Sequence, residues 1–87
     1  MRKMLEKEKV IIDVLDILVS ARRGLAFGDV MFQLNDIYQP SGEMMEKSLL
    51  LDILEDLTIQ GYIKKFQVGT LDSWKITEEG EDHFYSM

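Results

Sequence analysis

Apolar residues recur at helical spacing in three stretches of the chain, and each stretch predicts an α-helix. The first stretch runs from about Met4 to Ala21. Between residues 10 and 21 it is apolar around most of its circumference, and its polar sector consists only of Asp13, Asp16 and Ser20. Arg22-Arg23-Gly24 ends it, because cations suit a helix C-terminus and glycine tolerates a left-handed turn. A helix of this kind is usually buried on more than one side.

Two shorter stretches predict the second and third helices. The second begins at Gly28-Asp29 and reaches about Tyr38, with a buried stripe of Val30, Met31, Leu34 and Ile37. Residues 39–42, Gln-Pro-Ser-Gly, have the composition of a turn. The third helix runs from about Glu43 or Met44 to Gln60, and its buried face carries Leu50, Ile53, Leu54 and Leu57.

Alternating apolar and polar residues in the last third of the chain predict a β-hairpin. Residues 62–68 are rich in aromatic and branched side chains, which favour a strand. Residues 69–73 are typical of a turn, and Trp74-Lys75-Ile76 alternates as a half-buried strand does. Leu25-Ala26-Phe27 is a candidate for a brief edge strand, and Thr77 is a candidate N-cap for a final short helix.

The composition fits one small domain over residues 1–87. The hydrophobic fraction is 46%, the charged fraction is 30%, and there is no cysteine. Disulfides, thiolate metal sites and a cysteine nucleophile are therefore excluded, and we expect the protein in a reducing cytoplasm. The longest apolar runs are three residues, such as Ile17-Leu18-Val19, and are far too short to span a membrane. No uncharged apolar stretch follows Arg2 and Lys3, so we expect no signal peptide.

No arrangement of residues in the sequence indicates an enzyme. His83 is the only histidine, and a metal site needs more ligands than it can supply. The carboxylates show no spacing typical of a general acid and base pair, and no phosphate loop or nucleophile motif is present. We therefore expect no catalytic activity, no bound metal and no cofactor.

Three motifs in a fixed order carry a resemblance to a known superfamily. The first is Leu25-Ala26-Phe27-Gly28-Asp29-Val30 with Leu34, and the second is Leu50, Leu54 and Leu57 followed by Gly61-Tyr62-Ile63. The third is Trp74-Lys75-Ile76-Thr77-Glu78-Glu79-Gly80. Together they resemble the winged helix-turn-helix superfamily, and within it the PadR and MarR types. The resemblance implies a mainly α fold, with a three-helix core and a two- to three-stranded wing, and a DNA-binding regulator of transcription.

The first helix carries more apolar surface than a three-helix domain covers. Its heptad-like positions form a seam on which we expect a second copy to pack, giving a homodimer: Met1, Leu5, Ile12, Leu15 and Val19, with Glu8 as the one polar member. The alternative is that the wing or the C-terminal segment covers this face within one chain.

The third helix lies where a recognition helix would enter the major groove, but its outward face is acidic. That face carries Ser48, Leu51, Asp52, Glu55 and Ile59, and the formal net charge of the chain is -6. Phosphates would be repelled there, so cations elsewhere have to compensate. The candidates are the lysines of the wing, Arg22 and Arg23 at the end of the first helix, and an N-terminal arm of Arg2, Lys3, Lys7 and Lys9, and we consider a contact led by the wing. The predicted contact residues are Lys47, Ser48, Lys64, Lys65, Thr70, Ser73 and Lys75. The alternative is that these lysines are ordinary solvated positions at strand edges.

A second function is open at this stage. The acidic and partly apolar outward face of the third helix is also suited to a basic protein partner instead of double-stranded DNA. The salt dependence of DNA binding separates the two functions, because phosphate contacts weaken steeply with ionic strength.

Overall fold

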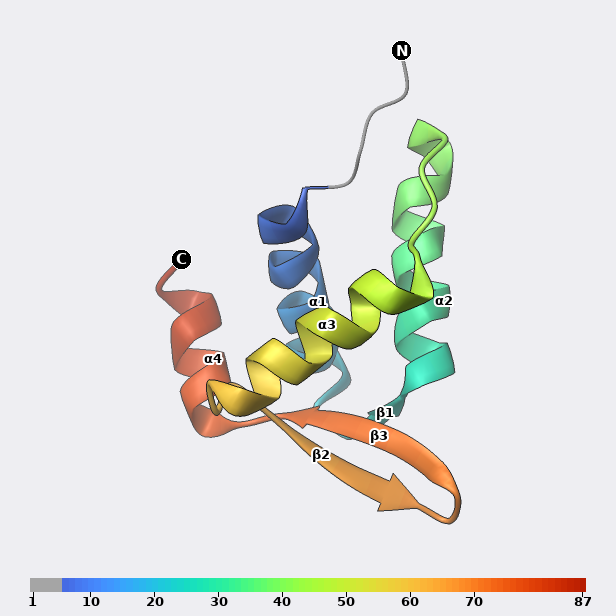
Figure 1. Ribbon diagram of the computed structural model, residues 1–87. Helices are drawn as coiled ribbons and strands as arrows, with labels where there is room; N and C mark the ends of the chain where they lie inside the picture. Colours follow the sequence, from blue (N-terminus) through green and yellow to red (C-terminus); the bar gives the residue numbers. More distant parts are fainter. Residues whose placement is uncertain (1–5) are drawn as a thin grey trace.

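The helices pack against a small antiparallel sheet, and two strands of this sheet project from the molecule as a β-hairpin (Figure 1). The computed structural model describes residues 6–87. The elements in chain order are α1 (Lys7–Ala21), β1 (Leu25–Ala26), α2 (Phe27–Tyr38), the 3-10 turn η1 (Gln39–Ser41), α3 (Lys47–Ile59), β2 (Ile63–Val68), β3 (Leu71–Ile76) and α4 (Glu78–Tyr85). The strands are ordered β1-β3-β2, so the early two-residue strand pairs with the last one. We call the hairpin of β2 and β3 the wing.

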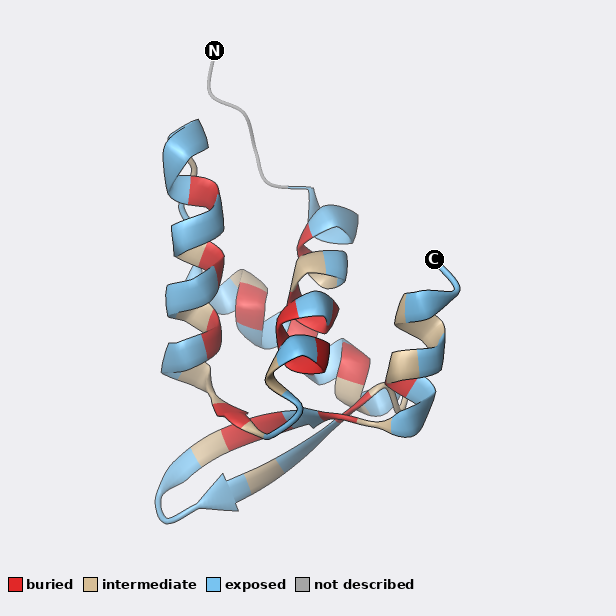
Figure 2. Ribbon diagram, turned by 180° about the vertical axis from the view of Figure 1, so that it is seen from behind, coloured by how far each residue is buried: buried red, intermediate tan, exposed pale blue. Residues whose placement is uncertain are grey.

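The core lies where α1, α2 and α3 meet above the base of the wing (Figure 2). The apolar positions of α3 that helical spacing places on one face are all buried, as predicted: Leu50, Ile53, Leu54 and Leu57. In α2 the stripe is shorter than predicted. Val30 and Leu34 are fully buried, whereas Ile37 is 46% exposed. Trp74 and Ile76 of β3 are the residues that the sheet's last strand contributes to this core.

The surface of α1 is covered largely within the chain, and this changes the predicted dimer seam. Leu15 is fully buried and Val19 is 7% exposed, so neither is available to a second copy. The helix α4 packs against α1, as the alternative interpretation expected of the C-terminal segment. Ile12 is the described seam position that stays open, at 43% exposure. The other two, Met1 and Leu5, lie outside the described residues.

The helix α3 begins at Lys47, later than the predicted Glu43 or Met44. The backbone N–H of Met45 donates a hydrogen bond to Oδ1 of Asn35 at 2.8 Å, and the Met45 side chain is buried. This contact with α2 holds the chain before α3 outside helical geometry, and Glu46 has extended φ and ψ. A side chain from another element therefore sets the start of α3.

Three local features of the wing and its surroundings differ from the sequence prediction. The turn is only Gly69-Thr70, because β3 already begins at Leu71 and pairs with Val68. The left-handed residue after α1 is Arg22, with φ 56°, and not Gly24. Gly24 is required for a different reason, since a Cβ there would collide with the ring of Phe66.

The base of the wing is fastened to α4 as the capping pattern predicts. The backbone N–H of Gly80 donates to Oγ1 of Thr77 at 3.0 Å, which confirms the predicted N-cap. The same Oγ1 lies 2.7 Å from the carbonyl oxygen of Gly61. Gly80 also passes so close to the backbone of Tyr62 that no side chain fits between them. These elements form a winged helix, as predicted.

Candidate nucleic-acid interface

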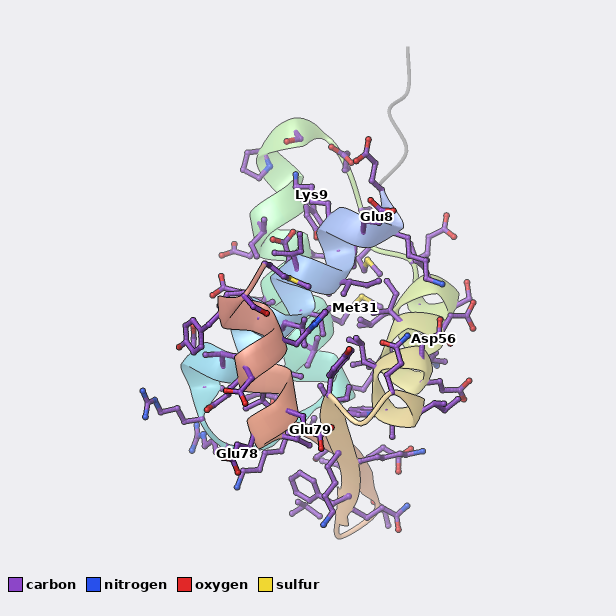
Figure 3. The ribbon with its side chains drawn as sticks, turned by 90° about the vertical axis from the view of Figure 1, so that its left-hand side faces the viewer. Glu8, Lys9, Met31, Asp56, Glu78 and Glu79 are labelled. Atoms are coloured by element: carbon purple, nitrogen blue, oxygen red, sulfur yellow. The ribbon has the colours of Figure 1, made fainter. Side chains whose placement is uncertain are left out.

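The outward face of α3 is the first part of the interface predicted from the sequence. Because the opposite side of the helix is packed into the core, its exposed residues are those expected: Ser48, Leu51, Asp52, Glu55 and Ile59. Asp56 on the flank is paired with Lys7 of α1, with 3.1 Å between Nζ and Oδ2, and is labelled in Figure 3. Lys47 and Ser48 are exposed in the first turn. The helix thus presents two carboxylates, Asp52 and Glu55, that form no ion pair with any residue from 6 to 87, where phosphates would have to approach.

The wing divides the predicted DNA-contacting residues between its two faces. Successive side chains of a strand point to opposite sides, and the register pairs Lys64 with Lys75 and Lys65 with Trp74. We call the side with Lys64, Phe66, Val68, Leu71, Ser73 and Lys75 the outer face. The inner face carries Ile63, Lys65, Gln67, Asp72, Trp74 and Ile76, and it is turned toward the core and α3. Neighbouring lysines in the sequence therefore belong to different surfaces.

Ser73 is not part of an exposed interface. It is 4% exposed, and in the sheet it lies between Ala26 of β1 and Phe66 of β2. The prediction placed it in a turn, but the strand β3 begins two residues earlier. Thr70, in contrast, is exposed at the tip of the wing. It stands between two exposed apolar residues, Val68 and Leu71.

The outer face carries a cluster of cations. Lys64 and Lys75 are exposed and lie directly opposite each other on adjacent strands. Like charges in this position destabilise a sheet. Among residues 6–87 the ion pairs are Lys7–Asp56 and Lys65–Asp72, so neither of these lysines is neutralised by a carboxylate. The folded chain therefore gains no ion-pair stabilisation from these two lysines.

The loop after α1 brings two arginines beside this face. Gly24 lies against the ring of Phe66, so the loop of Arg22 and Arg23 borders the outer face of the wing. Phe66 and Lys64 are two positions apart on one strand, about 7 Å. Both arginines are exposed. The sequence named them only as further cations that could compensate, because spacing alone does not show that this loop lies beside the wing. Gly24, which has no Cβ to collide with the Phe66 ring, was the one available signal.

Lys65 is held on the inner face by its neighbours. Its Nζ lies 3.6 Å from Oδ2 of Asp72 and 5.8 Å from the centre of the Trp74 ring. Oδ1 of the same carboxylate accepts a hydrogen bond from Gln67 at 3.1 Å. Between this group and α3 lies a groove of about 190 Å³, lined by Leu51, Glu55, Thr58, Ile59, Lys65, Asp72 and Trp74. Lys65 therefore lines the groove and is not part of the cation cluster on the outer face.

Other chemistry is sparse among the described residues. Across residues 6–87 no three acidic, histidine or cysteine side chains gather as metal ligands would. His83 stacks on the ring of Tyr62, with 4.2 Å between ring centres and 7° between ring planes. No helix in this part of the chain has the length and apolar character needed to cross a membrane.

Solved structures share this fold at low sequence identity. Cth-833, a transcriptional regulator from Clostridium thermocellum, superposes with a TM-score of 0.78 at 17% identity, over 92% of this chain and 77% of its own. RosR of H. salinarum gives 0.71 at 22% identity, over 98% and 71%. TA0346 from Thermoplasma acidophilum gives 0.71 at 15% identity, over 92% and 77%. No protein-family model matches the chain, and no curated protein is significantly similar to it in sequence. These structural similarities establish the winged-helix fold. They do not establish the function, which depends on the residues at the surface.

Proposed function

We propose that the protein is a regulator of transcription that binds double-stranded DNA as a homodimer and makes its contacts with the outer face of the wing. The observation that carries this proposal is the cross-strand pair of Lys64 and Lys75, which has no carboxylate partner. Arg22 and Arg23 extend the cation cluster from the adjacent loop. The fold shared with the regulator Cth-833 supports the same function.

The contact works by neutralising phosphates. Each lysine acts as a point charge, whereas the planar guanidinium of an arginine binds two phosphate oxygens at once. The exposed hydroxyl of Thr70 is placed at the tip to donate a further hydrogen bond. Asp52 and Glu55 repel phosphates, so α3 remains outside the major groove. Binding is consequently dominated by the DNA backbone, and it carries little direct reading of base sequence.

The homodimer brings two wings to one duplex. The exposed part of α1, marked by Ile12, is the surface we assign to the second copy. In Ile12→Glu a charge replaces an apolar contact, so the dimer should dissociate at concentrations where the unaltered protein is dimeric. Light scattering at micromolar concentration measures the mass. A monomer mass for the unaltered chain would contradict this part of the proposal.

DNA binding is tested by titrating a labelled duplex at increasing salt. If four cations contact phosphates, the logarithm of the binding constant should fall with the logarithm of salt concentration with a slope of about -3 to -4 per protomer. Lys9→Glu is the control for net charge, because it makes the protein more negative at the N-terminal end of α1, away from the cations of the wing (Figure 3). It should leave the slope unchanged. Absence of binding at low salt would refute the proposed function.

A further inference from the structure

The groove between α3 and the wing has an apolar lining that the fold itself does not use. Ile59, in the last turn of α3, is 83% exposed, and Leu51 two turns earlier is 37% exposed. Both line the groove, together with Trp74 of β3. Trp74 is otherwise buried at 3% exposure and packs against Phe27, so it is a fixed part of the groove. An exposed apolar surface beside a rigid aromatic ring is a common feature of binding sites.

The size of the groove limits what it can hold. Pockets that enclose a whole drug-sized ligand measure roughly 300–1,000 Å³. This groove measures about 190 Å³ and is open to solvent. It therefore suits a single large apolar side chain, presented by a partner whose other parts remain outside. Such an anchor in a small pocket is how many protein interfaces gain most of their affinity.

The charges around the groove select the partner. Glu55 lines it, and Asp52 lies on the same exposed face of α3. The cation of the groove, Lys65, is already engaged by Asp72 at 3.6 Å. The rim therefore has an excess of negative charge, which attracts lysine or arginine and repels the phosphates of DNA.

We infer that the groove between α3 and the inner face of the wing binds a cationic segment of a partner protein, and that one large apolar side chain of that segment inserts against Trp74. Arginine or lysine residues next to the anchor pair with Glu55 and Asp52. Because the outer cations and this groove lie on opposite faces of the wing, DNA and the partner segment can occupy the protein together. The inference is independent of DNA binding.

Trp74 gives a direct signal for occupancy, because it is the only tryptophan in the chain. The probe is a short synthetic peptide in which arginine and leucine alternate, added to the full chain while tryptophan emission is followed. One control peptide has serine for leucine, and another has glutamate for arginine. Only the peptide that carries both arginine and leucine should saturate and change the emission. Equal binding of the serine peptide would show general attraction to an acidic protein and would overturn the inference.

Variants locate the site. Ile59→Ser removes an exposed apolar contact, and Glu55→Gln removes a rim charge; both positions are on the solvent side of α3, so the core is left intact. Ile59→Ser should weaken peptide binding about tenfold, which is the effect of losing much of one buried side chain. Asp36→Asn on α2 is the control for Glu55→Gln, because it removes one exposed carboxylate outside the groove. Equal affinity in Asp36→Asn and Glu55→Gln would contradict the inference.

Reciprocal variants complete the test, because an arginine-rich peptide binds DNA itself and direct competition would not be informative. The inference requires that Lys64→Gln leaves the peptide affinity unchanged and that Ile59→Ser leaves DNA affinity unchanged. If Ile59→Ser weakens DNA binding, the groove is a nucleic-acid site and the protein partner is excluded. Failure of DNA to bind at all refutes the proposed function while leaving the peptide result standing.

Discussion

The two faces of the wing have opposite chemistry although alternate residues of the same two strands form them. On the outer face, Lys64 and Lys75 oppose each other without a carboxylate partner. On the inner face, Lys65 is paired with Asp72 and lies over the ring of Trp74. Adjacent lysines in the sequence therefore differ in their contacts: Lys65 is engaged by Asp72 within the protein, whereas Lys64 has no carboxylate partner among residues 6–87.

This contrast shows that the fold does not determine where a winged helix carries its charge. The helix in the recognition position, α3, exposes Asp52 and Glu55, whereas the cations gather on the far side of the wing. A shared architecture with solved structures thus establishes the fold alone, and any contact surface has to be argued from individual side chains.

We expect the largest effect from Lys75→Glu, which would give the outer face an ion pair, as the inner face already has. The new carboxylate lies opposite Lys64 and neutralises it, so two cations are lost to DNA at once. DNA affinity at low salt should fall about tenfold or more. Folding stability should rise by up to about 1 kcal/mol, because an opposite-charge pair replaces a like-charge pair. Affinity and urea denaturation measure the two changes, and equal affinity with lower stability would contradict a binding role.

Tyr38→Phe tests whether binding can be separated from stability. The buried Tyr38 hydroxyl donates a hydrogen bond to the Asp13 carboxylate, and its loss should cost about 1–2 kcal/mol of unfolding free energy. DNA and peptide affinities should not change, because the pair lies on α1 and α2, apart from both faces of the wing. A change in either affinity would show that binding by the wing depends on the stability of the core.

The same pair predicts a dependence of stability on alkaline pH. Burial, followed by the hydrogen bond to Asp13, raises the pKa of Tyr38 above its ordinary value of 10.0. The folded chain therefore keeps the phenol protonated while the unfolded chain loses that proton. The contribution is complete below about pH 10 and is lost as the pH rises beyond it. In Tyr38→Phe the decline of stability above that pH should be shallower; identical curves would exclude this origin.

Gly24→Ala should separate the arginine loop from the wing with a smaller loss of stability. The added Cβ collides with the Phe66 ring, so either the ring turns or the loop of Arg22 and Arg23 lifts. We expect a loss of about 1 kcal/mol and weaker DNA binding. In a chain that already carries Phe66→Ala, Gly24→Ala should cost little further stability, because the ring is then absent. A double variant with fully additive losses would show that the two residues do not interact.

The sequence predicted most of the elements, and its failures have identifiable causes. Helical spacing identified the buried face of α3, and strand alternation identified the hairpin, although not its register. The late start of α3 depends on a hydrogen bond from Met45 to Asn35 of another helix, which no local pattern shows. The seam prediction was wrong at Leu15 and Val19 because their burial depends on tertiary packing around α1, which the pattern within that helix does not reveal.

The candidate site was less predictable than the fold. Alternation shows which wing residues share a face, but it does not show which face is turned toward α3. Ser73 was wrongly placed in an exposed turn because Gly69 and Thr70 alone are sufficient to close the hairpin. The arginines of the loop lie beside the outer face because Gly24 contacts Phe66. These two residues are far apart in the sequence, so no local pattern shows the contact.

The contrast between the two faces of the wing is tested most directly by comparing Lys64→Gln with Lys65→Gln. Each variant removes one positive charge, at adjacent positions of the same strand, so the change in net charge is the same in both. The slope of DNA affinity against salt should become shallower by about one for Lys64→Gln and should stay unchanged for Lys65→Gln. Equal changes in both variants, or a change in Lys65→Gln alone, would contradict the assignment of DNA binding to the outer face.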